Sequence, residues 1–156
     1  MKHIQLTQDQ FAIVDDEDYD ELSKHRWYAW WNRDTRSYYA VRSIWLPNRK
    51  KTTEYMHRLI LGLKYGDKRQ GDHLNHHTLD NRRTNIRVVS CSENQHNRHG
   101  KGFRWRKKKY EAYIAVNGTQ KHLGRFDDPA EARTAYLQAK RIYHPTTPLA
   151  ILEKEI

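Results

Sequence analysis

Charged residues are segregated along the chain, and this segregation limits how the chain can fold. Residues 9–21 contain seven carboxylates and no Lys or Arg, whereas residues 101–126 contain eight Lys or Arg and a single Glu. Residues 57–99, which lie between them, are rich in Asn and Arg and hold six of the ten histidines. Side chains suited to chemistry and side chains suited to binding a polyanion are therefore concentrated in different places, which predicts two regions with different tasks.

We place the boundary near residues 99–100, where glycine and basic residues interrupt the polar pattern. This gives a first region over residues 1–99, a second over residues 101–144 and a loose tail over residues 145–156. Because no Pro- or Ser-rich stretch separates the two regions, we expect a short link between them.

The formal net charge of +10 over 156 residues predicts a polyanionic partner, and nucleic acid is the obvious one. Five Trp and ten Tyr are too many large rings for a disordered chain. No apolar run approaches the roughly 20 residues of a membrane span, and no apolar signal segment is present, so we expect no membrane partner and a cytoplasmic location. Cys91 is the single cysteine, which excludes a disulfide framework and a multi-cysteine zinc site.

In the second region, residues 103–106, 110–116 and 120–126 are rich in β-formers and predict three strands. Asn117 and Gly118 form a strong hairpin signal between the last two. A helix is expected from Asp128 and Pro129 to the residue before His144. We therefore predict a three-stranded antiparallel sheet packed on one helix.

The first region is less regular. We predict strands at residues 11–14 and 86–89, and a short helix at residues 18–22. Two aromatic stretches, at 26–31 and 37–42, predict a hairpin whose rings are more typical of a core than of a base-stacking platform. Residues 54–61 fit a strand or a helix equally well. Ser90 and Glu93 form a capping-box pattern, which starts a further helix. The whole chain is predicted to be α+β.

The polar residues before that helix form a spaced set. Asp72 and His73 are followed by Asn85, which lies 12 residues after His73, and by Asn94, nine residues further on. This set resembles the HNH endonuclease signature, in the variant of phage and intron-encoded homing nucleases. The resemblance implies a ββα-metal core over residues 71–99, preceded by a β-rich lead-in over residues 1–70.

The chemistry of phosphodiester hydrolysis suits these residue types. A neutral imidazole can take a proton from water near neutral pH, so His73 is the candidate base. Asp72 and Asn94 offer hard oxygen ligands to a divalent metal, Mg²⁺ first and Mn²⁺ as an alternative, without a small-molecule cofactor. Asn85 is expected to hold the loop that orients His73. Since neighbouring strand residues point to opposite sides, we expect a bend at Asp72.

Other residues near this set have less defined roles. Three arginines are natural phosphate contacts, and two further side chains are secondary candidates. His57 fits a packed, a DNA-facing or a catalytic role, and the acidic residues 9–21 should lie away from bound DNA. The family's small turn residue is replaced here by His76 and His77, which leaves the turn geometry open. The phosphate candidates are Arg82, Arg83 and Arg87, and the secondary candidates are His57 and Asn97.

Residues 101–144 carry a second resemblance, to the ethylene-response-factor (Apetala-type) DNA-binding domain, which is also found appended to phage HNH nucleases. The resemblance implies a sheet that enters the major groove with the helix behind it. Alternation independently places Ala112, Ile114 and Val116 on the helix side. The opposite face and its flanks supply the candidate DNA contacts. These are Lys101, Arg104, Arg106, Lys108, Tyr113, Gln120, His122 and Arg125.

Several alternatives stay open. The Asn-rich segment could only form turns. A structural zinc site could use histidines, although no cysteine pair accompanies them. The candidate ligands are His57, His73, His76, His77, His96 and His99. With one metal site, a monomer should nick one strand of DNA. The alternative functions are a non-catalytic, sequence-specific DNA-binding protein with an inactive HNH finger, and an RNA-directed or structure-specific nuclease.

Overall fold

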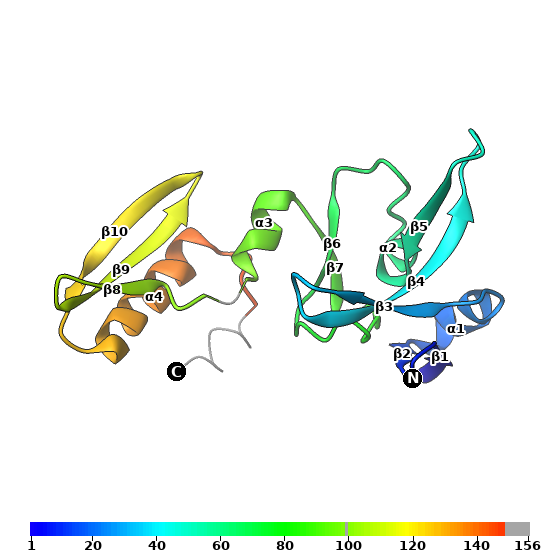
Figure 1. The fold of residues 1–156 in the computed structure, drawn as a ribbon, viewed down its shortest axis with the longest axis horizontal. Helices are drawn as coiled ribbons and strands as arrows, with labels where there is room; N and C mark the ends of the chain where they lie inside the picture. The colour runs from blue at the N-terminus through cyan, green and yellow to red at the C-terminus, as the bar shows by residue number, and fades with distance from the viewer. Residues whose placement is uncertain (99, 149–156) are drawn as a thin grey trace. The chain divides into compact units, whose positions relative to one another are not determined.

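The computed structural model describes residues 1–98 and 100–148, and it divides into two compact units, Met1–Cys91 and Ser92–Ile156. Each unit is described by itself (Figure 1). The division falls before the boundary expected from charge, so the helix at residues 91–96 lies at the junction and most of it belongs with the second unit. Residue 99 of the expected boundary and residues 149–156 of the expected tail lie outside the described residues.

The protein is α+β, as predicted, and its sheets are antiparallel. In the first unit β1 (Lys2–Gln5) pairs with β2 (Phe11–Val14), and α1 (Asp16–Ser23) follows. A three-stranded sheet in the order β3-β4-β5 comes next, made of β3 (Tyr28–Asn32), β4 (Ser37–Trp45) and β5 (Lys51–Tyr55). The ambiguous residues 54–61 form both predicted structures, because β5 ends at Tyr55 and α2 (Met56–Ile60) begins at the next residue.

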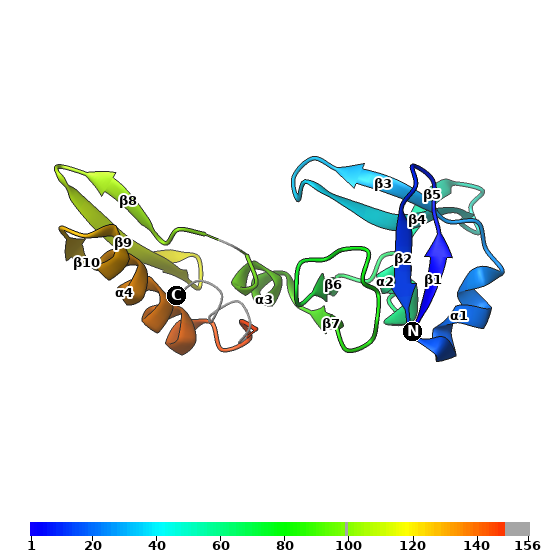
Figure 2. The ribbon, with the colours of Figure 1, turned by 90° about the horizontal axis from the view of Figure 1, so that it is seen from below.

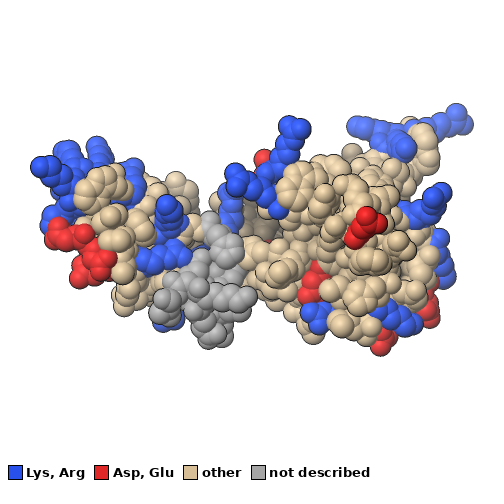
Figure 3. Space-filling model, turned by 60° about the horizontal axis from the view of Figure 1, so that its bottom comes forward, with Lys and Arg blue, Asp and Glu red and all other residues tan. Residues whose placement is uncertain are grey.

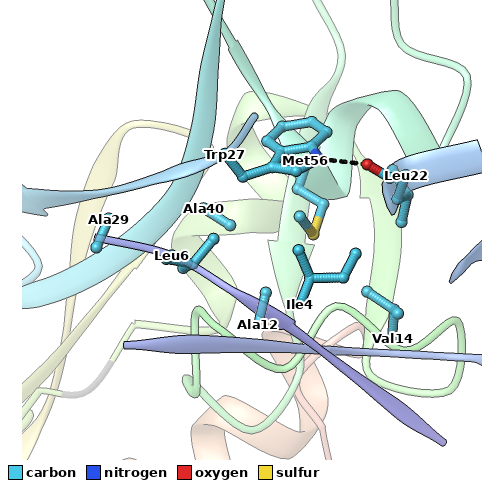
Figure 4. Packing of buried hydrophobic residues seen from close by; sticks show 9 residues of the cluster. All are labelled: Ile4, Leu6, Ala12, Val14, Leu22, Trp27, Ala29, Ala40 and Met56. Atoms are coloured by element: carbon cyan, nitrogen blue, oxygen red, sulfur yellow. Dashed lines mark hydrogen bonds between the residues drawn. The ribbon is translucent and has the colours of Figure 1, made fainter. Parts of the chain in front are cut away.

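The core of the first unit lies between these two sheets and α1 (Figure 4). Trp27 is buried there, and its indole Nε1 donates a hydrogen bond to the carbonyl oxygen of Leu22 at 2.9 Å. Met56 is completely buried beside it. The expected aromatic core is therefore only partly correct, because Trp30 and Trp31 of the same stretch are 41% and 46% exposed.

The segment that carries the spaced polar set begins with β6 (Gln70–His73) and β7 (Ile86–Val89), which form a two-stranded antiparallel sheet. Helix α3 (Cys91–His96) follows directly. Strand, strand and helix thus occur in the predicted order along the chain.

The second unit contains β8 (Phe103–Arg106), β9 (Lys109–Val116) and β10 (Thr119–Phe126), with β9 in the middle. Asn117 and Gly118 have φ values of 49° and 77°, as a tight hairpin turn requires. Helix α4 (Pro129–Tyr143) is capped by the Asp128 side chain, which accepts a hydrogen bond from the Ala130 amide at 2.9 Å.

Helix α4 packs on one face of this sheet (Figure 2). Ile114 of β9 is buried against Tyr136, Leu137 and Ala139 of the helix. The predicted sheet-on-helix arrangement is therefore confirmed. Within the described residues, no helix is both long and apolar enough to cross a membrane.

Candidate functional site

His73 lies at the end of β6 with its imidazole packed inside the first unit. The residue is 5% exposed, and its ring meets that of His57 edge-on, with 4.7 Å between the centroids. The ring of Tyr39 lies 6.1 Å away. Burial lowers the pKa of His73 below its usual 6.5, while a hydrogen bond with Asn81 and the nearby carboxylates oppose that shift. The imidazole is therefore neutral near pH 7, as a proton acceptor must be.

Asn81 fixes which nitrogen of His73 carries the proton. The Asn81 Nδ2 donates to the Leu79 carbonyl oxygen at 3.1 Å, which turns Oδ1 toward His73 Nε2 at 3.3 Å. Because Oδ1 is an acceptor, Nε2 must be the donor, and the lone pair lies on Nδ1. Asn81 was not among the predicted site residues, although it lies within the polar segment that pointed to the others.

Asn85 holds together the two ends of the loop that follows β6. Its Nδ2 donates to the Asp80 carbonyl at 2.8 Å, and its Oδ1 accepts from the Asn75 amide at 3.1 Å. Its own carbonyl accepts from the Leu74 amide at 2.8 Å. These are the side-chain to backbone bonds expected of a loop-holding residue.

The turn with the unusual histidines is built by Asn75. The Asn75 Oδ1 accepts from the His77 amide at 2.8 Å, and His76 adopts a left-handed conformation with φ of 63°. A glycine or asparagine would take this conformation more easily than His76. The turn therefore forms without the family's small residue, with the side chain of Asn75 bridging it.

Asp72 faces away from His73. Its Oδ2 accepts from Nε of Arg87 at 2.9 Å, Nη2 of the same guanidinium lies 2.9 Å from that oxygen as an ion pair, and the two residues are directly opposite in the β6–β7 ladder. The ladder runs through Asp72 and His73 with a continuous register. The bend that we expected at Asp72 is therefore absent from the ladder, and regular strand alternation separates the two side chains.

His57 is a packed histidine in contact with the candidate base. It is 6% exposed, and a Cβ added to Gly71 would lie only 2.3 Å from its ring, so the glycine makes room for it. Burial, and secondarily His73, place the pKa of His57 well below 6.5. Both imidazoles are neutral, which fits their edge-on contact.

The predicted phosphate contacts in this unit are paired with the protein's own carboxylates. Arg82 makes a two-pronged pair with Asp80, at 2.8 and 2.7 Å, and this interaction is the main cause of the lowered pKa of Asp80. Arg83 binds Asp18 in the same way, at 2.9 and 2.6 Å. The acidic segment thus lies against this loop, and Arg82, Arg83 and Arg87 are all engaged within the fold.

The remaining members of the predicted metal set lie in the second unit. Asn94 is in α3, and Asn97 is 2% exposed just after it, whereas Asp72 belongs to the first unit. Across residues 1–98 and 100–148, no three His, Cys, Asp or Glu side chains converge into a metal site. The predicted ligands are a carboxylate in the first unit and an amide in the second, and each supplies the hard oxygen that Mg²⁺ prefers.

The histidine zinc site is not assembled among the described residues, and His99 lies outside them. His96 instead stacks on His144, with 4.1 Å between ring centroids, and its Nδ1 lies 2.9 Å from the hydroxyl of Thr146. Both histidines of this stack are half-buried in the second unit.

The exposed face of the β8–β9–β10 sheet collects most of the predicted DNA contacts. Strand register aligns them in rows across the sheet, on the side opposite the buried Ala112 and Ile114. Lys101 lies before β8, and Lys108 lies in the turn after it with φ of 61°. Residues that share the exposed face are Arg104, Arg106, Tyr113, Gln120, His122 and Arg125.

Glu111 lies in the middle of these arginines. Its carboxylate is 3.3 Å from Arg104, 3.6 Å from Arg125 and 4.0 Å from Arg106. The guanidinium of Arg104 also lies over the ring of Tyr113 at 5.4 Å. Three cations around one anion leave a positive surface, and Lys and Arg side chains cover much of this unit in Figure 3.

Searches with the whole chain find no matching family model, no matching curated protein and no matching solved structure.

Proposed function

We propose that the protein is a metal-dependent DNA endonuclease of the HNH homing type, with an ethylene-response-factor-type sheet as its DNA-binding module. The observation that carries the proposal is the geometry at His73, whose imidazole is buried at the end of β6 with Nε2 3.3 Å from the Asn81 Oδ1, where burial favours the neutral ring. A general base for water needs this protonation state and a fixed orientation.

The residues divide the reaction between them. His73 Nδ1 accepts a proton from a water molecule as the water oxygen attacks phosphorus, and the bond from phosphorus to the 3′ oxygen breaks. A divalent cation, Mg²⁺ or Mn²⁺, would supply Lewis-acid stabilisation of the leaving oxygen, and Asp72 is the predicted ligand of the first unit that would hold it. Asn85 keeps the loop in place so that the imidazole does not turn away.

The C-terminal sheet supplies target binding in this proposal. Arginine recognises guanine by two parallel hydrogen bonds in the major groove, while Lys contributes affinity through phosphates. Arg104, Arg106 and Arg125 share one exposed face of the sheet, where they surround Glu111, and from this face they are available for such contacts. With one metal set per chain, a monomer should nick one strand of double-stranded DNA in a single engagement.

The test is nicking of supercoiled plasmid by the full chain at low salt, with Mg²⁺ or with EDTA. We expect open-circular DNA to form only when the metal is present. The rate of its formation should fall by about 10²- to 10⁴-fold in His73→Ala. His3→Ala is the matched control, because it removes an exposed histidine of β1 from the same unit. Equal nicking by His73→Ala and His3→Ala would contradict the proposed role of His73.

A second candidate function rests on the Asp72–Arg87 pair. Arg87 binds Oδ2 of Asp72 and therefore competes with a metal ion for this carboxylate. Such a pair is expected in an HNH finger that binds no metal and has no catalytic activity. The protein would then be a non-catalytic, sequence-specific DNA-binding protein. Salt-sensitive binding of duplex DNA, with no nicking in Mg²⁺ or Mn²⁺ on any plasmid that contains a bound site, favours this candidate.

A further inference from the structure

The β3–β4–β5 sheet of the first unit has a face that the proposed function leaves unused. This face, called the open face below, is buried at its middle, where Val41 is 0% exposed, and accessible at Trp30 and Trp45. Register places Trp30 opposite Tyr39, and Trp45 opposite Lys51, on this face. Ala29 and Ala40 point the other way, into the core. The open face is strongly exposed at its far end, where Trp45 is 71% accessible.

This face leads directly to the candidate base. The rings of Trp30 and Tyr55 meet edge-on at 6.1 Å, and those of Tyr55 and Tyr39 do so at 5.6 Å. Tyr39 in turn lies 6.1 Å from the ring of His73. A ligand lying on the sheet would therefore continue from exposed aromatic rings to the proposed reaction centre within one unit.

The charges at this sheet favour a polyanion. No carboxylate lies on the open face among its described residues, because Glu54 is on the opposite face, where Arg42 binds it at 2.6 Å. Exposed cations occupy the turns at both ends of β4 and the first residue of β5, and one exposed carboxylate, Asp34, lies between Arg33 and Arg36. Among the described residues, these side chains form no ion pair and face solvent: Arg33, Arg36, Arg49, Lys50 and Lys51.

The spacing of the two turns suits duplex DNA. The nine residues of β4 span about 30 Å at roughly 3.3 Å per residue. DNA rises about 3.4 Å per base pair, so the two basic turns are about nine base pairs apart. Lys and Arg side chains protrude from the edges of the first unit in Figure 3, and the surface between them is mostly uncharged with a few carboxylates.

We propose that the open face of the β3–β4–β5 sheet binds the duplex next to the scissile phosphate, with the basic turns on backbone phosphates and the aromatic face along the groove between them. The inference rests on the proposed function and gives the first unit a DNA-binding surface of its own. Ser43 and Thr53, opposite each other on this face, add hydroxyl donors for phosphate oxygens.

The experiment compares three double variants of the full chain, each of which removes two exposed cations. Arg33→Ala/Arg36→Ala and Lys50→Ala/Lys51→Ala change the two turns, while Lys64→Ala/Lys68→Ala is the control in a loop outside the sheet. The readout is binding of a mixed-sequence 30-base-pair duplex between 50 and 200 mM salt, without metal. Each turn variant should lower the slope of log K against log salt by close to two, at about 0.9 per phosphate contact.

A second readout separates this surface from the catalytic residues. In plasmid nicking, the turn variants should raise KM several-fold with kcat nearly unchanged, since neither turn reaches His73. Slopes and KM values equal to those of Lys64→Ala/Lys68→Ala would overturn the inference while wild-type nicking still supports the proposed function. Absence of both binding and nicking in the wild type would instead overturn the proposed function itself.

A second copy of the chain is the competing occupant. Trp45→Ala should leave the sedimentation coefficient of the free protein unchanged and weaken duplex binding. If Trp45→Ala instead abolishes self-association and keeps full DNA affinity, the face is an interface with a second copy of the chain, and the inference fails.

Discussion

The arginines of the loop between β6 and β7 and those of the C-terminal sheet look alike in sequence but differ in structure. Arg82 and Arg83 each bind a carboxylate through two nitrogens, so their charges are neutralised within the fold. Arg104, Arg106 and Arg125 share the single carboxylate of Glu111. An arginine can bind DNA only if no carboxylate of the protein already neutralises it. The number of Lys and Arg residues in a stretch of sequence does not show which of them are neutralised in the fold.

The largest effect should follow from the sheet arginines. Replacing Arg104 and Arg106 together by Ala removes two side chains suited to guanine, each worth about 1–3 kcal/mol of discrimination. We expect specific DNA affinity to fall at least about 30-fold while the thermal unfolding midpoint stays the same, because both side chains are exposed. Fluorescence anisotropy with a selected duplex, beside circular dichroism melting, measures the two quantities.

The loop arginines should show the reverse pattern. Asp80 is 5% exposed and accepts hydrogen bonds from Arg82 and from the side-chain Nδ2 of Asn75, so Asp80→Ala removes several hydrogen bonds to a charged group. We expect a loss of about 2 kcal/mol in the free energy of unfolding. Urea unfolding followed by tryptophan fluorescence measures it, with Asp34→Ala, in an exposed turn, as the control.

Arg83→Ala extends the same test to DNA. Because its guanidinium is held by Asp18, the salt dependence of DNA binding should not change. A slope reduced by about one would mean that Arg83 leaves Asp18 for a phosphate, and the contrast between the two groups of arginines would fail.

The sequence was sufficient for the second unit because its signals are local. Asn117 and Gly118 determine the turn, Asp128 caps the helix, and alternation along β9 separates Ile114 from Tyr113. Each signal involves neighbours within a few residues, and the predicted strands and helix were confirmed.

The first unit depends on partners distant in sequence, and there the predictions were incomplete. The contact between Arg83 and Asp18 joins residues 65 apart, and nothing local indicates it. Trp27 and Trp30 belong to one aromatic stretch, yet one is core and the other exposed. The pattern did supply His73 and Asn85, while the role of Asn81 required the direction of an amide oxygen, which only the folded loop defines.

The buried histidines predict how the stability of the first unit depends on pH. Burial lowers the pKa of His57 well below 6.5, so the folded protein keeps it neutral while the unfolded chain protonates it below about pH 6.5. The unfolded state then binds more protons, so stability should be full above pH 7 and decrease as the pH falls below 6.5. Urea unfolding in EDTA between pH 5 and 8 measures this, and His57→Gln should flatten the profile. An unchanged profile in that variant would exclude His57 as its source.

The smallest effect should come from Glu111, the carboxylate that the second unit places among its arginines. Glu111→Gln removes the anion and keeps the shape, so DNA of random sequence should bind up to about fivefold more tightly, as expected for a partly exposed ion pair. Discrimination between target and random duplex should decrease at the same time, because Arg104 and Arg125 lose the group that orients them. Anisotropy with both duplexes at one salt concentration measures the ratio. If the affinities for target and random duplex rise equally, Glu111 only reduces the positive charge of the sheet and does not orient the arginines. The carboxylates of the two units would then have different roles, because Asp80 stabilises the fold and Glu111 weakens DNA binding.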